Sequence, residues 1–253
     1  MTRYQFVRLC ARISIAACLA GLPGAIAPVR ADDTMAKATV AVALDHLHYL
    51  PAGKPNAVQL LAPPPLPDSP EQAADLAEVR AVSRLTTSND MAIAYSQKIF
   101  TAFTFAPAIG PFFVSNNLPR TTAFFHRVQE DAEAVTDNAK DFYRRPRPYV
   151  VDPALANGKL EKSFSYPSGH STESMVLALV LAEVFPDRKD AIIAEARDIG
   201  WHRVEIARHY PTDIYAGRVF ARAIVRQMKA SADFQKDFAA AQAEVALARH
   251  IPK

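Results

Sequence analysis

Three short clusters of residues in the second half of the chain have the types and spacing needed to bind an anion and move a proton. The first is Lys140-Asp-Phe-Tyr-Arg-Arg-Pro-Arg147-Pro148. Arg147 lies between two prolines, which restrict the backbone and present its guanidinium from a stiff loop. A guanidinium matches two phosphate oxygens at once, and Lys140 adds a point charge. Taken alone, a basic helix end of this kind is more typical of a solvated surface.

The second cluster is Tyr166-Pro167-Ser168-Gly169-His170, directly before a long apolar run. Free backbone N–H groups at the start of a helix bind anions, and Gly169 allows a phosphate to approach closely. Ser168 adds a hydroxyl donor, and His170 can donate a proton. The alternative is an ordinary helix-capping serine followed by a surface histidine.

The third cluster is Arg203-Val-Glu-Ile-Ala-Arg-His209-Tyr-Pro-Thr-Asp213. The four-residue step from His209 to Asp213 places the carboxylate one helical turn on, on the same face. A carboxylate on one ring nitrogen fixes the tautomer that leaves the other nitrogen free to attack. For a single histidine a structural role would be favoured, but the three clusters together indicate phosphoryl transfer.

Together the clusters resemble the signature of the type 2 phosphatidic acid phosphatase superfamily, which includes the vanadium haloperoxidases. In the first part of that signature, six residues separate a lysine from an Arg-Pro pair. The second part is Pro-Ser-Gly-His. In the third part, five residues separate an arginine from a histidine, and three more separate that histidine from an aspartate. Within the superfamily the chain most resembles the bacterial class A non-specific acid phosphatases, which are secreted and all-helical. The proline run at 63–67 and the helix after it fit that branch, and the resemblance extends from about Leu60 to Arg226.

The resemblance implies a role for each matching residue. The phosphate oxygens would be held by a cradle of cations, a hydroxyl and a backbone amide, from Lys140, Arg147, Ser168, Gly169 and Arg203. His209 would attack phosphorus, Asp213 would orient it, and His170 would protonate the leaving alcohol. The sequence departs from the family at His202, where a serine is usual. That serine is not the nucleophile, so we expect catalysis to survive.

The chemistry implied needs no cofactor and no metal ion. A phosphoryl transition state spreads negative charge over three oxygens, which fixed cations and helix-end amides can stabilise. His46-Leu47-His48 beside Asp45 has the spacing of metal ligands, but surface residues of an N-terminal arm are the favoured interpretation. The chain has no Walker loop, no Gly-x-Ser-x-Gly elbow and no HExxH motif.

The elements that must position these clusters are predicted to be helices. Residues 32–62 form a partly helical arm, and 63–253 the all-helical phosphatase domain. Helical patterns and breaks predict a buried helix and turn over 100–114, a proline-enforced loop over 146–153, and helices over 70–85, 122–142, 168–186, 187–208, 213–229 and 232–249. Ser69 and Gln72 predict a capping box at the first of these helices. No alternating strand is found. The predicted fold is all-α, a single-domain multi-helix bundle.

The first 31 residues have the features of an export signal. A positive start, at Arg3, Arg8 and Arg12, precedes an apolar stretch over 13–27. Cleavage is expected after about Ala31, which would place the mature chain in the periplasm. Both cysteines, Cys10 and Cys18, lie inside this signal. A lipid anchor on Cys18 is the less favoured alternative.

The net charge of +3 comes from 29 basic and 26 acidic residues, but residues 1–31 hold four arginines and no acid. The mature chain would carry 25 basic and 26 acidic residues, a net charge of −1, which gives no support to nucleic-acid binding. The expected partners are small phosphate monoesters, with neither nucleic acid nor, in the mature form, a membrane. Homo-oligomer formation is left open.

We therefore favour a secreted, metal-independent acid phosphatase over three alternatives. A vanadate-dependent haloperoxidase would use the same cradle for vanadate, with His209 as its ligand, but the modest length and the class A features argue against it. A bilayer-embedded lipid phosphatase would need several spans, and no mature segment qualifies. A periplasmic phosphate-binding protein without turnover is the third.

Overall fold

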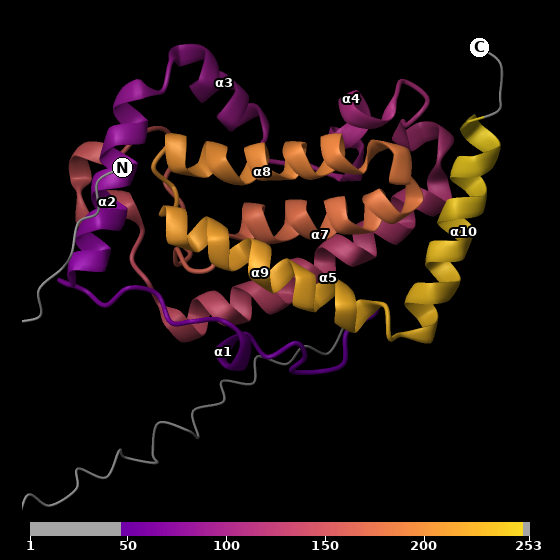
Figure 1. The fold of residues 1–253 in the computed structure, drawn as a ribbon, viewed down its shortest axis with the longest axis horizontal. Coiled ribbons are helices and arrows are strands. Elements are labelled where there is room, and N and C mark those ends of the chain that lie inside the picture. Colours follow the sequence, from indigo (N-terminus) through magenta and orange to yellow (C-terminus); the bar gives the residue numbers. More distant parts are fainter. Residues whose placement is uncertain (1–46, 250–253) are drawn as a thin grey trace, which may run out of the picture. The chain divides into compact units, whose positions relative to one another are not determined.

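The computed structural model describes residues 47–249, and these form helices and loops with no strand (Figure 1). The predicted all-α class is confirmed. The predicted export signal, the first part of the arm and His46 lie outside the described residues. Within the described part of the chain, no helix is both long enough and apolar enough to cross a membrane.

Helix α7 (Gly169–Val184) is the central helix of the bundle. It packs against α5 (Pro119–Tyr143), α8 (Lys189–Glu205) and α9 (Pro211–Met228), which run alongside it in Figure 1. The apolar residues of α7 are distributed around the whole helix, and most of its residues are buried. This arrangement agrees with the sequence pattern, because a helix that is apolar all round is buried all round.

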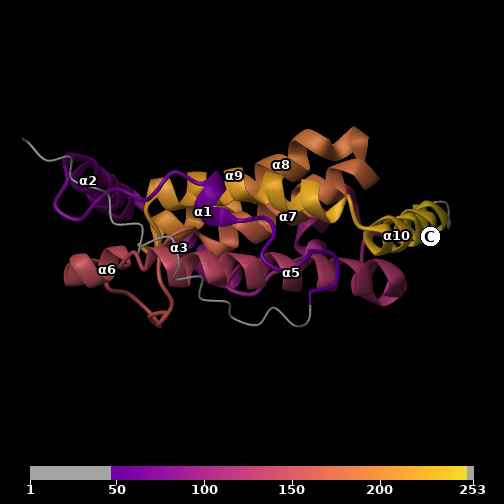
Figure 2. The same cartoon turned by 90° about the horizontal axis from the view of Figure 1, so that it is seen from below.

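The direction of the chain brings four helix ends together. The C-terminal ends of α5 and α8 meet the N-terminal ends of α7 and α9 in Figure 1. The Ser168 amide donates to the Asp213 carbonyl across 3.1 Å, and Lys140 of α5 lies beside Gly169 at the start of α7. Helix α2 (Pro70–Leu85) contacts α8 and α9, whereas α10 (Ala232–Arg249) contacts α5. Figures 1 and 2 show α2 and α10 at opposite ends of α7. The predicted clusters lie at the end near α2.

Two glycines allow α8 and α9 to approach the first turn of α7 closely. A Cβ on Gly217 of α9 would lie 2.9 Å from the carbonyl oxygen of Ser168, nearer than any side chain allows. A Cβ on Gly200 of α8 would lie 3.2 Å from the Cβ of Ser171. The N-terminus of α7 is therefore held between the two neighbouring backbones.

Most predicted helices are confirmed, and the differences concern their ends. Helix α2 begins at Pro70, and Ser69 caps it by accepting from the Gln72 amide at 3.1 Å. The predicted capping box is only half formed, because the Gln72 side chain instead accepts from Arg145 at 2.7 Å. Helix α3 (Ser88–Ser96) was not predicted; it is nine residues long and starts with a Thr87/Asp90 capping box.

The proline-rich segments contain short helical turns. The predicted loop over 146–153 includes α6 (Pro148–Val151) and leads into η4 (Pro153–Leu155), because proline suits the first position of a helix. The predicted helix over 187–208 starts with a separate turn and ends at Glu205. The remaining short elements are α1 (Ala57–Leu60), η2 (Ala102–Phe105), α4 (Ala106–Ile109), η3 (Ser115–Asn117) and η5 (Pro186–Arg188).

The described part of the predicted arm lies against α5. Buried Asp131 of α5 accepts hydrogen bonds from three successive backbone amides, at 2.7, 2.7 and 3.0 Å, those of His48, Tyr49 and Leu50. Helix α1 follows, with Asn56 as its cap. The arm is thus partly helical, as predicted, while its boundary with the helical domain stays a prediction.

Candidate active site

His209 lies in the loop between α8 and α9, where it contacts a cation on one side and a carboxylate on the other. Its Nε2 is 3.2 Å from Nη1 of Arg147, and its Nδ1 is 3.4 Å from Oδ2 of Asp213. A guanidinium can only donate, so Nε2 accepts and the ring proton belongs on Nδ1. The tautomer expected from the His209–Asp213 spacing is the one these partners favour.

The surroundings of His209 keep its ring neutral. Complete burial and then the nearby charge of Arg147 hold the pKa of His209 well below its ordinary value. A neutral imidazole keeps a lone pair on Nε2 even in acid solution. Such a ring can act as a nucleophile at pH values where an ordinary histidine is protonated.

Asp213 is held rigidly by several donors. Its Oδ1 accepts from Nη1 of Arg145 at 2.6 Å, and its Oδ2 accepts from Oγ of Ser165 at 2.5 Å and from the Tyr210 amide at 2.9 Å. The same Ser165 hydroxyl is 3.4 Å from Nδ1 of His209. Ser165 thus bridges the carboxylate and the ring that it orients.

Sequence reasoning missed both Arg145 and Ser165. Nη2 of Arg145 donates to Asp75 at 2.6 Å and to Gln72 at 2.7 Å, and its guanidinium lies 3.9 Å from the centre of the Tyr210 ring. Helix α2 is therefore tied to the carboxylate that orients His209. Arg145 lies inside the first predicted cluster and Ser165 directly before the second, but nothing in the local pattern distinguishes a buried arginine or serine from a solvated one.

Arg147 is the cap residue of α6 and is almost fully buried. Its Nε and Nη2 donate to the backbone and hydroxyl oxygens of Ser163 at 2.7 and 2.9 Å, and its Nη1 donates to the Arg208 carbonyl at 2.9 Å. These bonds fix the guanidinium plane beside His209. Arg147 is thus presented from a restrained segment, as its two flanking prolines predicted.

Lys140 and the start of α7 face one another. Nζ of Lys140, from the last turn of α5, donates to Asp137 at 2.7 Å and lies 3.1 Å from the place where a Cβ of Gly169 would be. Ser168 caps α7, with its Oγ accepting from the Ser171 amide at 3.3 Å. The structure thus places an ammonium group beside Gly169 at the N-terminus of α7, and helix N-termini favour anions.

His170 and Arg203 complete the group. Nε2 of His170 is buried and has no hydrogen-bond partner among the described residues, while its ring packs against Phe100 with the centres 5.4 Å apart. Burial, followed by the charge of Arg203, holds the pKa of His170 well below its usual value. Arg203, in the last turn of α8, donates to the Ala94 carbonyl, and burial lowers its pKa to about 10.

His202 does not join the predicted residues. Its Nδ1 lies 2.6 Å from Oε1 of Gln97, at the end of α3. His48 likewise lies away from them, 3.0 Å from Glu130, which His126 also contacts at 3.0 Å. Within residues 47–249 there is no group of three or more His, Cys, Asp or Glu side chains arranged to hold a metal ion.

A sequence model of the PAP2 superfamily matches residues 131–235. This stretch holds all of the predicted catalytic and phosphate-binding residues, from Lys140 to Asp213. An acid phosphatase of Zymomonas mobilis is 30% identical over 204 residues, which is 76% of this chain and 77% of that protein. A non-specific acid phosphatase of Providencia stuartii is 32% identical over 148 residues, 56% of this chain and 60% of that protein.

Two further proteins share less. A lipid A 1-phosphatase of Rhizobium etli is 43% identical over 56 residues, 22% of this chain and 24% of that protein. The crystal structure of the first transmembrane PAP2 type phosphatidylglycerolphosphate phosphatase from Bacillus subtilis superposes with a TM-score of 0.46 and 19% identity, covering 69% of this chain and 89% of that one. On the similarity to the acid phosphatases and the matching site segment, the chain belongs to the acid phosphatases of the PAP2 superfamily.

Proposed function

We propose that the chain hydrolyses phosphate monoesters through a phosphohistidine on His209, without a metal ion, and that it does so in the periplasm after export. Membership of the family supports phosphatase activity. The observation that carries the mechanism is the environment of His209: a buried neutral ring with Nδ1 facing Asp213 and Nε2 facing the guanidinium of Arg147.

In the first step the ester phosphate would bind among the cations and helix-end amides, which share the charge of its oxygens. Nε2 of His209 would leave Arg147 and form a bond to phosphorus while the bond to the ester oxygen breaks. His170 would give its proton to that oxygen, so a neutral alcohol departs. In the second step water would attack the phosphohistidine, His170 would take the water proton, and inorganic phosphate and free His209 would result.

The role of His170 depends on the bound substrate. In the empty site, burial and the neighbouring cation Arg203 keep its ring unprotonated. A phosphate group adds negative charge beside the ring and therefore raises its pKa, and acid solution supplies the proton. The leaving oxygen would also give the unpartnered Nε2 its missing hydrogen bond. This favours an acidic pH optimum.

The test is an assay over a panel of phosphate monoesters at acid pH, repeated with vanadate and then with vanadate, peroxide and bromide. We expect hydrolysis that vanadate inhibits, with little bromination. Strong bromination without hydrolysis would identify a haloperoxidase, and phosphate binding without turnover would identify a binding protein.

For export, we expect the mature protein to begin near Asp32 and to be released from the periplasm without detergent. A retained Met1 or a lipidated Cys18 would overturn that part.

A further inference from the structure

A loop of residues 156–164, here called the Glu161 loop, connects η4 to the segment before α7, and neighbouring elements hold it in place. The Tyr95 hydroxyl of α3 donates to the side chain of Asn157 at 2.5 Å, and Arg208 donates to the Lys159 carbonyl at 3.2 Å. Gly158 has a φ of +52°, and a Cβ there would lie 2.6 Å from the Tyr95 hydroxyl. The positive φ would strain any other residue here, so glycine suits this tight turn.

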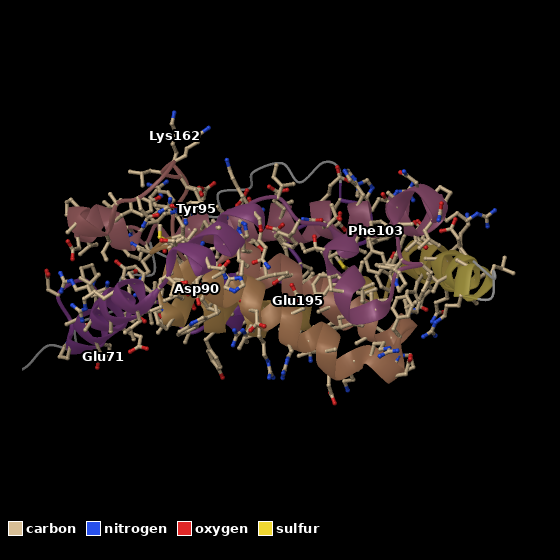
Figure 3. The ribbon with its side chains drawn as sticks, turned by 90° about the horizontal axis from the view of Figure 1, so that it is seen from above. Glu71, Asp90, Tyr95, Phe103, Lys162 and Glu195 are labelled. Atoms are coloured by element: carbon tan, nitrogen blue, oxygen red, sulfur yellow. The ribbon has the colours of Figure 1, made fainter. Side chains whose placement is uncertain are left out.

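The backbone of Glu161 is fixed on both sides by one side chain. The Tyr149 hydroxyl donates to the Glu161 carbonyl at 2.9 Å and accepts from the Glu161 amide at 3.1 Å. Lys162, the next residue, extends outward from the loop in Figure 3 and is exposed. The two neighbours therefore face different surroundings, with Glu161 turned toward the site and Lys162 toward solvent.

The Glu161 carboxylate lies among the cations of the candidate site. Its Oε2 is 2.5 Å from Nη2 of Arg147, the guanidinium whose Nη1 contacts His209. Burial alone would raise the pKa of Glu161, but positive charge outweighs burial and holds it below its ordinary value. That charge comes from Arg147 in the loop before α6, from Arg208 in the loop between α8 and α9, and from Lys140 of α5. The Glu161 charge also acts on Arg203 of α8.

We propose that the half-buried Glu161 carboxylate is an anion of the protein's own that occupies part of the phosphate cradle and has to leave Arg147 before a phosphate monoester can bind. It thereby sets the affinity of the site for its substrate. The cradle of the empty enzyme holds several buried cations, and a carboxylate among them offsets their mutual repulsion. The inference rests on the proposed function in that the cradle is taken to be the phosphate site.

The size of the effect of Glu161 on phosphate affinity follows from the Glu161–Arg147 ion pair, which the substrate has to replace. A hydrogen bond between charged groups is worth enough to change an affinity by about tenfold to a hundredfold. Because phosphate binding has to break the Glu161–Arg147 pair, the affinity for phosphate is lower by that factor. The factor falls on KM, whereas kcat, measured with the site filled, changes much less.

The test compares Glu161→Gln with wild type by calorimetric titration with inorganic phosphate at pH 7, together with KM for a phosphate monoester. We expect Glu161→Gln to bind phosphate about tenfold to a hundredfold more tightly and to lower KM by a similar factor. Lys162→Gln is the matched control, since it changes a charge on the same loop but faces solvent. It should shift phosphate affinity by less than about twofold, as expected of an exposed charge.

Acid pH supplies a second comparison. Because the pKa of Glu161 lies below its ordinary value, Glu161 keeps its charge from pH 7 to 5 and loses it only in stronger acid. The ratio of wild-type to Glu161→Gln dissociation constants should therefore stay constant over that range and approach one only at pH values below the ordinary carboxyl range.

Unchanged or weaker phosphate binding by Glu161→Gln would overturn the proposal, since Glu161 would then merely support Arg147. If Glu161→Gln does not fold, Glu161→Asp keeps the charge on a shorter side chain and is expected to bind phosphate more tightly than wild type; failure to do so counts equally against the proposal. Phosphate binding needs no turnover. A wild type that binds phosphate but hydrolyses no ester would contradict the proposed function alone.

Discussion

At the scale of single residues, the hydrogen bonds around Asp213 come from three separate segments of the chain. Arg145, Ser165 and the Tyr210 amide each donate to it. A carboxylate held in this way cannot turn away from His209, and in the proposed mechanism it would stabilise positive charge on the ring during attack. Residues that only hold Asp213 should therefore affect turnover more than substrate binding.

Ser165→Ala tests that reasoning. Removing the hydroxyl deletes the 2.5 Å bond to Asp213 and should lower kcat about tenfold with little change in KM, as expected for one charge-assisted hydrogen bond. Steady-state kinetics give both constants. Ser174→Ala is the control, because the equally buried Ser174 donates instead to the Ala196 carbonyl. Equal losses of kcat in both variants would contradict a specific role for Ser165.

Glu173 carries a pH-dependent contribution to stability. Burial above all raises the pKa of Glu173 to about 7, and Gln129 is its hydrogen-bond partner at 3.2 Å. A carboxyl whose pKa is raised by folding binds its proton more tightly in the folded state, so the protein loses stability as pH rises from about 4.5 to 7. Glu173→Gln removes this loss, which amounts to at most about 3 kcal/mol.

Thermal unfolding at pH 5 and pH 8 checks this expectation. The midpoint of Glu173→Gln relative to wild type should rise between the two pH values. Parallel changes in both proteins would show that Glu173 is ionised in the folded state at pH 5 as well.

The sequence could predict the residue types of the site but not the whole of it. Prolines, a helix-start glycine and a four-residue step are local signals, and they indicated Arg147, Gly169 and the pairing of His209 with Asp213. Ser165 and Glu161 gain their importance from partners 48 and 14 residues away, which only the folded chain brings together. Local pattern holds no information about such contacts.

At the scale of elements, the site depends on how closely α9 approaches α7. Gly217→Ala would place a methyl group 2.9 Å from the Ser168 carbonyl, and backbone cannot move aside as a flexible side chain can. We expect a loss of about 1–3 kcal/mol in unfolding free energy and a loss of activity, because the cap of α7 is displaced. Urea unfolding and kcat/KM measure the two effects.

Arg222→Ala, at an exposed position of the same helix, is the control and should change neither quantity appreciably. A Gly217→Ala protein with wild-type stability and activity would show that the contact between α7 and α9 has more freedom than the distances imply.

The predicted elements were most accurate where apolar periodicity extends over several turns, as in α5, α7 and α9. Short elements were not predicted well, because their formation depends on caps and tertiary contacts more than on periodicity. Helix α3 is nine residues long, and α6 is a single turn opened by a proline. The half-formed cap of α2 has the same origin: tertiary contact with Arg145 takes the Gln72 side chain.

At the scale of the whole molecule, the cations of the cradle come from different helices and are set in place by folding. Lys140 and Arg203 belong to α5 and α8, and Arg147 caps α6, so the folded chain itself supplies the positive charge that phosphoryl transfer requires. Activity should therefore persist within about twofold after exhaustive EDTA treatment. Loss of turnover that only a divalent ion restores would contradict metal independence.

The central claim is that His209 becomes phosphorylated, and brief exposure to radiolabelled substrate followed by alkaline denaturation tests it most directly. Acid quench is unsuitable, because phosphohistidine is acid-labile. The account predicts label on the wild-type peptide that contains His209 and none on the His209→Ala protein. His170→Ala should still become labelled by p-nitrophenyl phosphate, whose leaving group needs no proton, while losing about 10²–10⁴-fold in activity on alkyl phosphates. Label on the His209→Ala protein, or on Ser168, would contradict the account.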